Sequence, residues 1–143
     1  MKKEENQYDG PALGCKVGRA YQTMLRQLSE ALAGAGLEIS SGEYLVLRAV
    51  YSREGLQQCE IADMVGKDKA SVCRTVAALQ KKGLVATRAV SHKCLRVYLT
   101  DKSRAIEPAI MSVAAKRHQA LADATTPEEL EIFNRVLDKI INE

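Results

Sequence analysis

No apolar run in the sequence approaches the roughly 18 residues that a membrane-spanning helix needs. The first ten residues, MKKEENQYDG, also lack the apolar segment of a signal peptide. We therefore expect a cytoplasmic protein whose four cysteines stay reduced. With 143 residues, 46% of them hydrophobic and 27% charged, the chain is long enough for one globular domain with its own core.

Motifs for metal binding and catalysis are also missing from the sequence. No two cysteines form a C-x-x-C pair, and no histidine lies beside them at zinc-site spacing, so we expect neither a metal nor another cofactor. Paired carboxylates, a Ser-His-Asp order and a phosphate-binding glycine loop are all absent. Because the two histidines, His92 and His118, fall in a predicted loop and a charged helix, an enzyme is the least favoured class of function.

Basic residues are concentrated in one part of the chain. The net charge is only +3, but Lys67 to Arg96 holds eight basic residues and one acid, a charge of +7. The remainder, with 13 basic and 17 acidic residues, therefore carries −4. A basic block on an otherwise acidic chain indicates a polyanionic partner such as nucleic acid, although a solvated surface patch is the alternative.

The stretch Asp68–Leu84 predicts an amphipathic helix. Asp68 can cap the N–H groups of the first turn, and Gly83 can take the left-handed conformation that ends a helix. Apolar residues recur at spacings of four and three and define an inner face: Val72, Val76 and Leu79. The opposite face is small, polar and basic: Ser71, Arg74, Ala78 and Lys81.

The outer face of this helix suits the major groove of B-DNA, which is just wide enough for one α-helix. Ala70, Ser71 and Thr75 keep the leading turns narrow, and Arg74 can reach a guanine or a phosphate. An ordinary surface helix would show the same pattern, so the flanking sequence has to decide between the two interpretations.

A helix-turn-helix followed by a β-hairpin is predicted around this helix. After a turn at Ser52–Leu56, Gln57–Val65 forms a short helix that the turn Gly66–Lys67 connects to Asp68–Leu84. We expect Ile61, Met64 and Val65 to face inward on the short helix. A plain αα-hairpin is the alternative to this arrangement.

Two strand-like runs, Val85–Arg88 and Cys94–Thr100, predict the hairpin of a winged helix. In the second run Leu95, Val97 and Leu99 alternate with polar residues and should form one buried face. Basic side chains lie at the sides and tip of this wing, where they could enter a minor groove: Arg88, His92, Lys93 and Arg96. A winged helix used for protein–protein contact remains a second class of function.

Helices are predicted on both sides of this core at about 11–33, Ser40–Tyr51, about 101–122 and from Thr126 onward. Pro108 should kink the third of these helices or shift its start. The apolar arc of the last helix is too wide for a lone terminal helix, so we expect a second copy of the chain to cover it. The alternative is a monomer in which the terminal helices fold over the wing. The expected fold is thus mainly α with a small β-hairpin wing, in one domain: residues 38–100 form the winged-helix core, and residues 11–37 and 101–142 are dimerisation helices.

Three segments together resemble the MarR family of bacterial winged-helix transcription regulators: EYLVLRAV, IADMVGKDKASVCRTVAALQKKGLV and VYLTDKSRAI. The resemblance covers about residues 11–142. It implies an obligate dimer of triangular shape, built from the terminal helices, that binds promoter palindromes. It also implies that a small ligand or an oxidant relieves repression, so we expect a repressor.

DNA contacts follow from the predicted winged helix. We expect base contacts from Ser71, Arg74 and Thr75, and phosphate contacts from Lys67, Lys69, Lys81 and the wing. The wing departs from the family pattern, because Ser91-His92-Lys93 lacks the usual acid and the loop is about two residues short. We expect Arg96 and Lys93 to make the main phosphate or groove contacts of the wing. His92 would lie at its tip, and Arg88 would add a contact at the base of the strand.

Two means of control are compatible with the sequence. Cys15 lies near a helix start beside Lys16 and Arg19, which favours the thiolate that an oxidant sensor needs, and the peroxide-sensing branch of the family carries a cysteine at a similar place. Tyr44 falls where that branch has a tyrosine. Alternatively, a small aromatic or phenolic ligand could bind between the dimerisation helices and the winged helix, against Tyr21, Met24 and Tyr44. All four residues could equally well be packing residues of the core.

Overall fold

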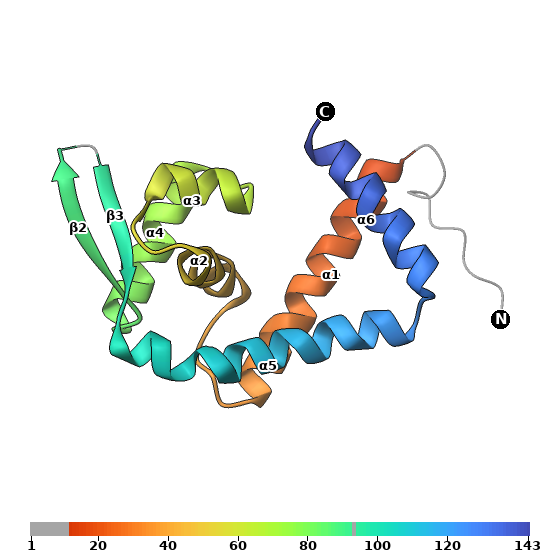
Figure 1. Ribbon diagram of the computed structural model, residues 1–143, viewed down its shortest axis with the longest axis horizontal. Helices are drawn as coiled ribbons and strands as arrows, with labels where there is room; N and C mark the ends of the chain where they lie inside the picture. The colour runs from red at the N-terminus through yellow and green to blue at the C-terminus, as the bar shows by residue number, and fades with distance from the viewer. Residues whose placement is uncertain (1–11, 93) are drawn as a thin grey trace.

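The computed structural model describes residues 12–92 and 94–143, which form six helices and a three-stranded antiparallel sheet (Figure 1). The elements in chain order are α1 (Leu13–Gly34), α2 (Ser41–Ser52), β1 (Leu56–Gln57), α3 (Gln58–Val65), α4 (Lys69–Lys81), β2 (Val85–Ser91), β3 (Cys94–Leu99), α5 (Asp101–Asp123) and α6 (Pro127–Ile141). One lobe holds α2, α3, α4 and the β2–β3 hairpin, and the other holds most of α1 together with α6. The long helix α5 runs along one side of the molecule and connects the two lobes. This is the expected winged helix-turn-helix fold.

Local capping determines where the helices begin and end. The Ser40 hydroxyl accepts from Glu43 N while Glu43 Oε1 accepts from Ser40 N, which makes a capping box at the start of α2. Thr126 and Glu129 form the same box before α6. At the end of α4, Gly83 has a φ of 75°, and Leu84 N donates to Leu79 O. This left-handed ending turns the chain directly into the wing.

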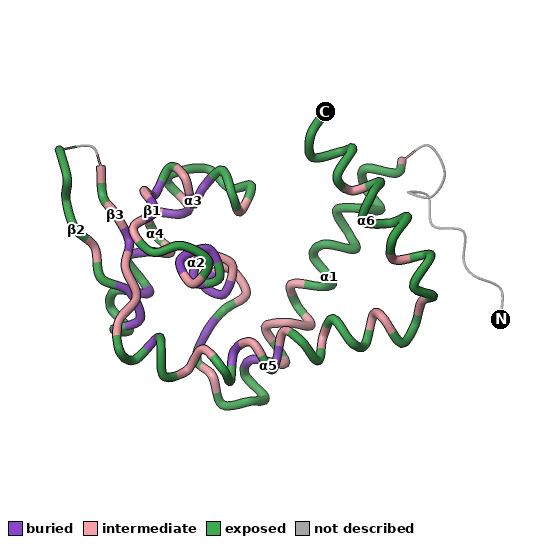
Figure 2. Tube along the Cα trace, viewed as in Figure 1, coloured by how far each residue is buried: buried purple, intermediate pink, exposed green. Residues whose placement is uncertain are grey.

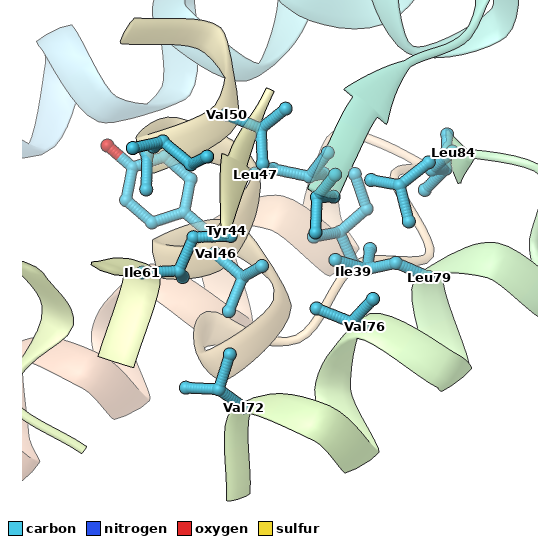
Figure 3. Packing of buried hydrophobic residues seen from close by; sticks show 14 of the residues in the cluster. Ile39, Tyr44, Val46, Leu47, Val50, Ile61, Val72, Val76, Leu79 and Leu84 are labelled. Atoms are coloured by element: carbon cyan, nitrogen blue, oxygen red, sulfur yellow. The ribbon is translucent and has the colours of Figure 1, made fainter. Parts of the chain in front are cut away.

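The hydrophobic core lies between α2, α3, α4 and the base of the sheet (Figure 3). The predicted inner face of α4 is confirmed, because Val72, Val76 and Leu79 are all fully buried. They pack into one cluster with residues such as Leu47 and Ile61. Burial of each such side chain is worth about 1.5–3 kcal/mol, so the core fixes how α4 lies on the rest of the lobe.

The sheet contains a strand that the sequence pattern did not predict. Leu56 and Gln57 form β1, which pairs with Val97 and Arg96 of β3, so the strand order is β1-β3-β2. The sequence had indicated a turn that ended at Leu56. A strand of two residues is too short to show the alternation by which strands are recognised.

Two further predictions about burial were wrong. Met64, expected to face inward on α3, is 56% exposed near the end of that helix. Leu95, expected in the buried face of the wing, is 38% exposed, whereas Val97 of the same strand is fully buried. The wing extends beyond the core at Leu95, which pairs with Ala89 just before a β-bulge. The alternation of the strand therefore continues where no core is left to bury it.

Helix α5 begins where predicted and continues through Pro108. The Thr100 side chain caps it by accepting from Ser103 N, so Pro108 did not shift its start. Tyr51 Oη donates to Ser103 O over 2.6 Å and so ties α2 to the first turn of α5.

In the lobe formed by α6 and most of α1, most residues are exposed (Figure 2), and these include many apolar ones. Leu13 at the start of α1 is 60% exposed, and Phe133 of α6 is 48% exposed. No residue of α6 is buried, although Ile132, Val136 and Ile140 also lie along it. Residue 11, where the first helix was expected to begin, lies outside the described residues. No helix in the described part of the chain is both long and apolar enough to cross a membrane.

Candidate DNA-binding surface and adjoining pocket

Helix α4 turns its small and basic side chains outward. Asp68 Oδ1 accepts from Ser71 N over 2.7 Å and caps the helix at the end where DNA contacts are expected. Arg74 is exposed, while Ser71 and Thr75 are half-buried on either side of it. Thr75 Oγ1 donates to Ser71 O, so this hydroxyl can serve a partner only as an acceptor unless that bond breaks.

Cations surround this outer face. Within residues 12–92 and 94–143, Lys69, Arg74 and Lys81 form neither an ion pair nor a side-chain hydrogen bond. Lys67 lies over the first turn of α2, where its Nζ would be 3.7 Å from a Cβ placed on Gly42. The helix thus presents several unneutralised positive charges around a narrow, mostly polar strip, as a phosphate backbone requires.

The two arginines of the wing, Arg88 and Arg96, lie in different environments. Arg88 is exposed, and its guanidinium lies 5.0 Å from the centroid of the Tyr98 ring. Arg96 is half-buried and directly opposite Arg88, and its Nη1 donates to Gly55 O over 2.8 Å. His92 is exposed at the tip, and Lys93 lies outside the described residues. Arg96 is therefore directed toward β1, whereas Arg88 remains available on the surface.

A pocket of about 480 Å³ opens between α1, α2 and α5. The structure brings together the three residues that were expected there, Tyr21, Met24 and Tyr44, among its lining. Basic groups not identified from the sequence also line it: Arg48, Arg117 and His118. Arg48 Nη1 donates to Tyr44 Oη over 2.8 Å, and Arg117 Nη2 donates to Gln27 Oε1 over 2.9 Å. No carboxylate occurs in the described lining, so the pocket combines apolar walls with positive charge.

Comparisons with known proteins agree with this geometry. The sequence model of the MarR family matches residues 35–93, from the end of α1 to the wing. An uncharacterized HTH-type transcriptional regulator of Bacillus subtilis, YybA, is 22% identical over 106 residues, which are 73% of this chain and 71% of YybA. The helix-turn-helix and the wing of this chain are thus similar to the MarR family. The similarity is to DNA-binding transcriptional regulators, a non-enzymatic class of protein.

Solved structures share the fold over most of the chain. The Staphylococcus aureus MepR–DNA complex has a TM-score of 0.78 at 20% identity and covers 88% of this chain and 93% of MepR. CouR from Rhodococcus jostii RHA1 bound to p-coumaroyl-CoA has a TM-score of 0.80 at 19% identity, with 96% of each chain covered.

Cys15 is separate from the pocket. It is exposed in the first turn of α1 and is not part of the pocket lining. Cys73 on α4 donates through Sγ to Gln58 Oε1 over 2.9 Å and so connects α4 to α3. The structure thus brings Tyr21, Met24 and Tyr44 together and leaves Cys15 apart from them.

The basic pocket residues gave only weak signals in the sequence. Arg48 follows Tyr44 by four residues, which places both on one side of a helix, but this spacing does not indicate a cavity. Arg117 and His118 lie about 70 residues further along the chain and reach the pocket only because α5 packs across α1.

Proposed function

We propose that the chain is a repressor that binds a palindromic promoter site as a homodimer and is released by a small aromatic anion. The observation that carries this proposal is the outer face of α4, which is narrow, polar and surrounded by cations that have no ion pair among the described residues. Such a face fits the major groove, and the MepR complex shows that a protein of this fold binds DNA.

The exposed apolar faces of α1 and α6 support the homodimer. Their exposed residues extend from Leu13 to Met24 on α1 and from Ile132 to Ile141 on α6. Large exposed apolar patches are rare on soluble monomers and mark sites of interaction. A two-fold dimer would cover these faces and present two α4 helices, which would require half-sites about 34–36 Å apart or multiples of that distance.

Base and phosphate contacts are proposed for different side chains. Ser71, Arg74 and Thr75 would read bases, because they lie along the outward strip of α4. Phosphates would be met by Lys67, Lys69 and Lys81. At the wing we propose that Arg88 leads and His92 supports it, because the Arg96 guanidinium is bonded to Gly55 O. Lys93 is retained as a proposed contact from the sequence alone.

The pocket supports release by an aromatic anion. Tyr21, Met24 and Tyr44 offer aromatic and polarisable surface, and Arg48 and Arg117 supply positive charge without a neighbouring carboxylate. CouR, a protein of the same fold, was crystallised with an acyl-CoA that carries an aromatic acyl group. The alternative trigger is oxidation of Cys15, which is an exposed thiol.

The first test selects duplexes from a random pool with the purified protein and then measures binding by fluorescence anisotropy across a salt series. A palindromic site should emerge, with an affinity that falls steeply as salt rises. Absence of both selectivity and salt dependence would favour the protein–protein interpretation.

Binding to the selected duplex distinguishes release by a ligand from release by an oxidant. Benzoate should weaken binding, whereas the isosteric neutral benzamide should not, because only the anion can pair with Arg48 and Arg117. Peroxide-dependent loss that dithiothreitol reverses, and that Cys15→Ser abolishes, would instead assign control to the thiol. Equal effects of benzoate and benzamide would contradict the anionic class of ligand.

A further inference from the structure

Lys82, the residue that follows the last turn of α4, directs its side chain toward the protein rather than toward the outer face. Its Nζ donates to Glu43 Oε1 over 2.9 Å and to Glu38 O over 2.8 Å. Glu43 lies in the first turn of α2, and Glu38 lies in the connection between α1 and α2. The ammonium group of Lys82 therefore connects the C-terminal end of α4 to two points around the start of α2.

Glu43 is an unusual partner because it is only 7% exposed. Its Oε1 also accepts from Ser40 N over 2.9 Å, and Oε2 is buried with no hydrogen-bond partner among the described residues. Burial raises the pKa of Glu43, but hydrogen bonds from Lys82 and Ser40 and the charge of Lys82 together hold it below its ordinary value of 4.5. Lys82 thus keeps a buried carboxylate charged. Such a pair is weak evidence for general stability, but removal of Lys82 would leave the Glu43 charge buried without its partner.

A second set of bonds joins the same point to α5. Lys102 Nζ donates to Lys82 O over 2.8 Å, and Thr100 Oγ1 donates to Gly83 O over 2.7 Å. Elements α2, α4 and α5 therefore meet at Lys82–Gly83. The next residue after Glu43 is Tyr44, which lines the pocket, so one turn of α2 touches both the pocket and the tie to α4.

We infer that Lys82 is a positioning residue for sequence-specific DNA binding: with Glu43 it fixes the angle of α4 against α2 without touching DNA. The inference rests on the proposed function. Arg74 lies eight residues before Lys82, about 12 Å along the helix. A small rotation about the C-terminal end would therefore displace Arg74 from its base, while phosphate contacts, which tolerate more displacement, would survive.

The test compares four variants on the selected duplex and on a scrambled duplex of equal composition. Lys82→Met keeps the aliphatic stem and removes the charge, and Glu43→Gln keeps the capping box. Each should lower affinity for the selected duplex roughly three- to thirtyfold. Neither should change affinity for the scrambled duplex or the salt slope by a measurable amount. The double variant should bind the selected duplex no more weakly than the more affected single variant does. Lys82→Arg keeps the positive charge, so its affinity should stay within about twofold of that of wild type.

Lys81→Met is the matched control, because Lys81 is the neighbouring exposed lysine and a proposed phosphate contact. It should weaken binding to both duplexes and reduce the salt slope by about one. Circular dichroism at the assay temperature checks that each variant is folded. If Lys82→Met does not fold, Glu43→Gln tests the same ion pair.

If Lys82→Met lowers both affinities and the salt slope as Lys81→Met does, Lys82 is a DNA contact and the inference is wrong. Losses that simply add in the double variant would also overturn it, because they would show two independent roles. Failure of the proposed function looks different, since wild type itself would then select no duplex.

Discussion

Arg74 is the residue on which sequence-specific DNA binding by this chain should depend most. It is the long exposed side chain at the centre of the outer face of α4, and nothing in the described residues pairs with it. A bidentate contact from arginine to a base is worth about 1–3 kcal/mol of discrimination. We therefore expect Arg74→Ala to weaken binding to the selected duplex by about 1–3 kcal/mol and to relax the preference at one base pair of each half-site, as measured by anisotropy on a set of single-base variants.

Lys69→Ala provides the comparison at the residue scale. Lys69 begins α4 and is exposed, so its removal should weaken binding to every duplex alike and lower the salt slope by about one. If Arg74→Ala gave this uniform pattern as well, Arg74 would be a phosphate contact and base reading would fall to Ser71 and Thr75.

Tyr51 gives a prediction on pH dependence. Burial, and secondarily the negative charge of Glu107, raise the pKa of Tyr51 from 10.0 to about 12. In the unfolded chain the phenol ionises near pH 10, whereas in the folded chain it stays neutral, so this contribution to stability is complete below pH 10 and is lost as the pH rises toward 12. Urea unfolding at pH 9 and pH 11 should show a larger loss of stability for wild type than for Tyr51→Phe. Equal losses in the two proteins would contradict the raised pKa.

Single residues also mark the limit of what the sequence could predict. The outward position of Arg74 followed from helical spacing alone. Lys82 carried no comparable signal, because its partner Glu43 is 39 residues away and the pair is created by the packing of α4 on α2. Local pattern assigns a residue to a face of its helix, but it does not give the partner that the tertiary fold provides.

At the scale of elements, helix boundaries could be predicted well because they depend on local chemistry. The capping boxes of α2 and α6 and the glycine that ends α4 are each recognisable within six residues of sequence. Strand β1 could not be predicted, since its two residues become a strand only by pairing with β3. The exposure of Leu95 was missed for a related reason, because alternation in the wing does not reveal where the core ends.

The wing yields a prediction that separates two arginines on one hairpin. Arg88→Ala should weaken binding to all duplexes and reduce the salt slope by about one, while stability changes by less than about 1 kcal/mol, because its contact with Tyr98 is exposed. Arg96→Ala should instead lower the free energy of unfolding by about 1–3 kcal/mol, because a charge-assisted hydrogen bond to Gly55 O is lost, and should leave the salt slope unchanged. Thermal unfolding and anisotropy measure the two effects. The reverse assignment would restore Arg96 as the leading wing contact.

The whole molecule shows why the pocket was only partly predicted. Its apolar residues on α1 and α2 were candidates from the sequence, but Arg117 and His118 join them from α5 only in the folded chain. The excess apolar surface of the last helix, in contrast, was evident from sequence, since its apolar arc exceeded what a lone helix could bury. In the structure that surface remains exposed on α6, together with the first half of α1.

The last prediction concerns this surface. Phe133→Glu places a charge in the middle of the exposed apolar face of α6, where burial against a second copy would be strongly unfavourable. Sedimentation velocity should show wild type at twice the 15.7 kDa chain mass and the variant at the mass of one chain. The variant should lose tight binding to the palindrome but keep weak binding to a single half-site, because the winged-helix lobe has its own core. Asn134→Glu adds the same charge to the next position of α6 and should leave the dimer intact. If Phe133→Glu stayed dimeric and bound the palindrome as wild type does, the terminal helices would not be the interface, and their apolar faces would need another partner.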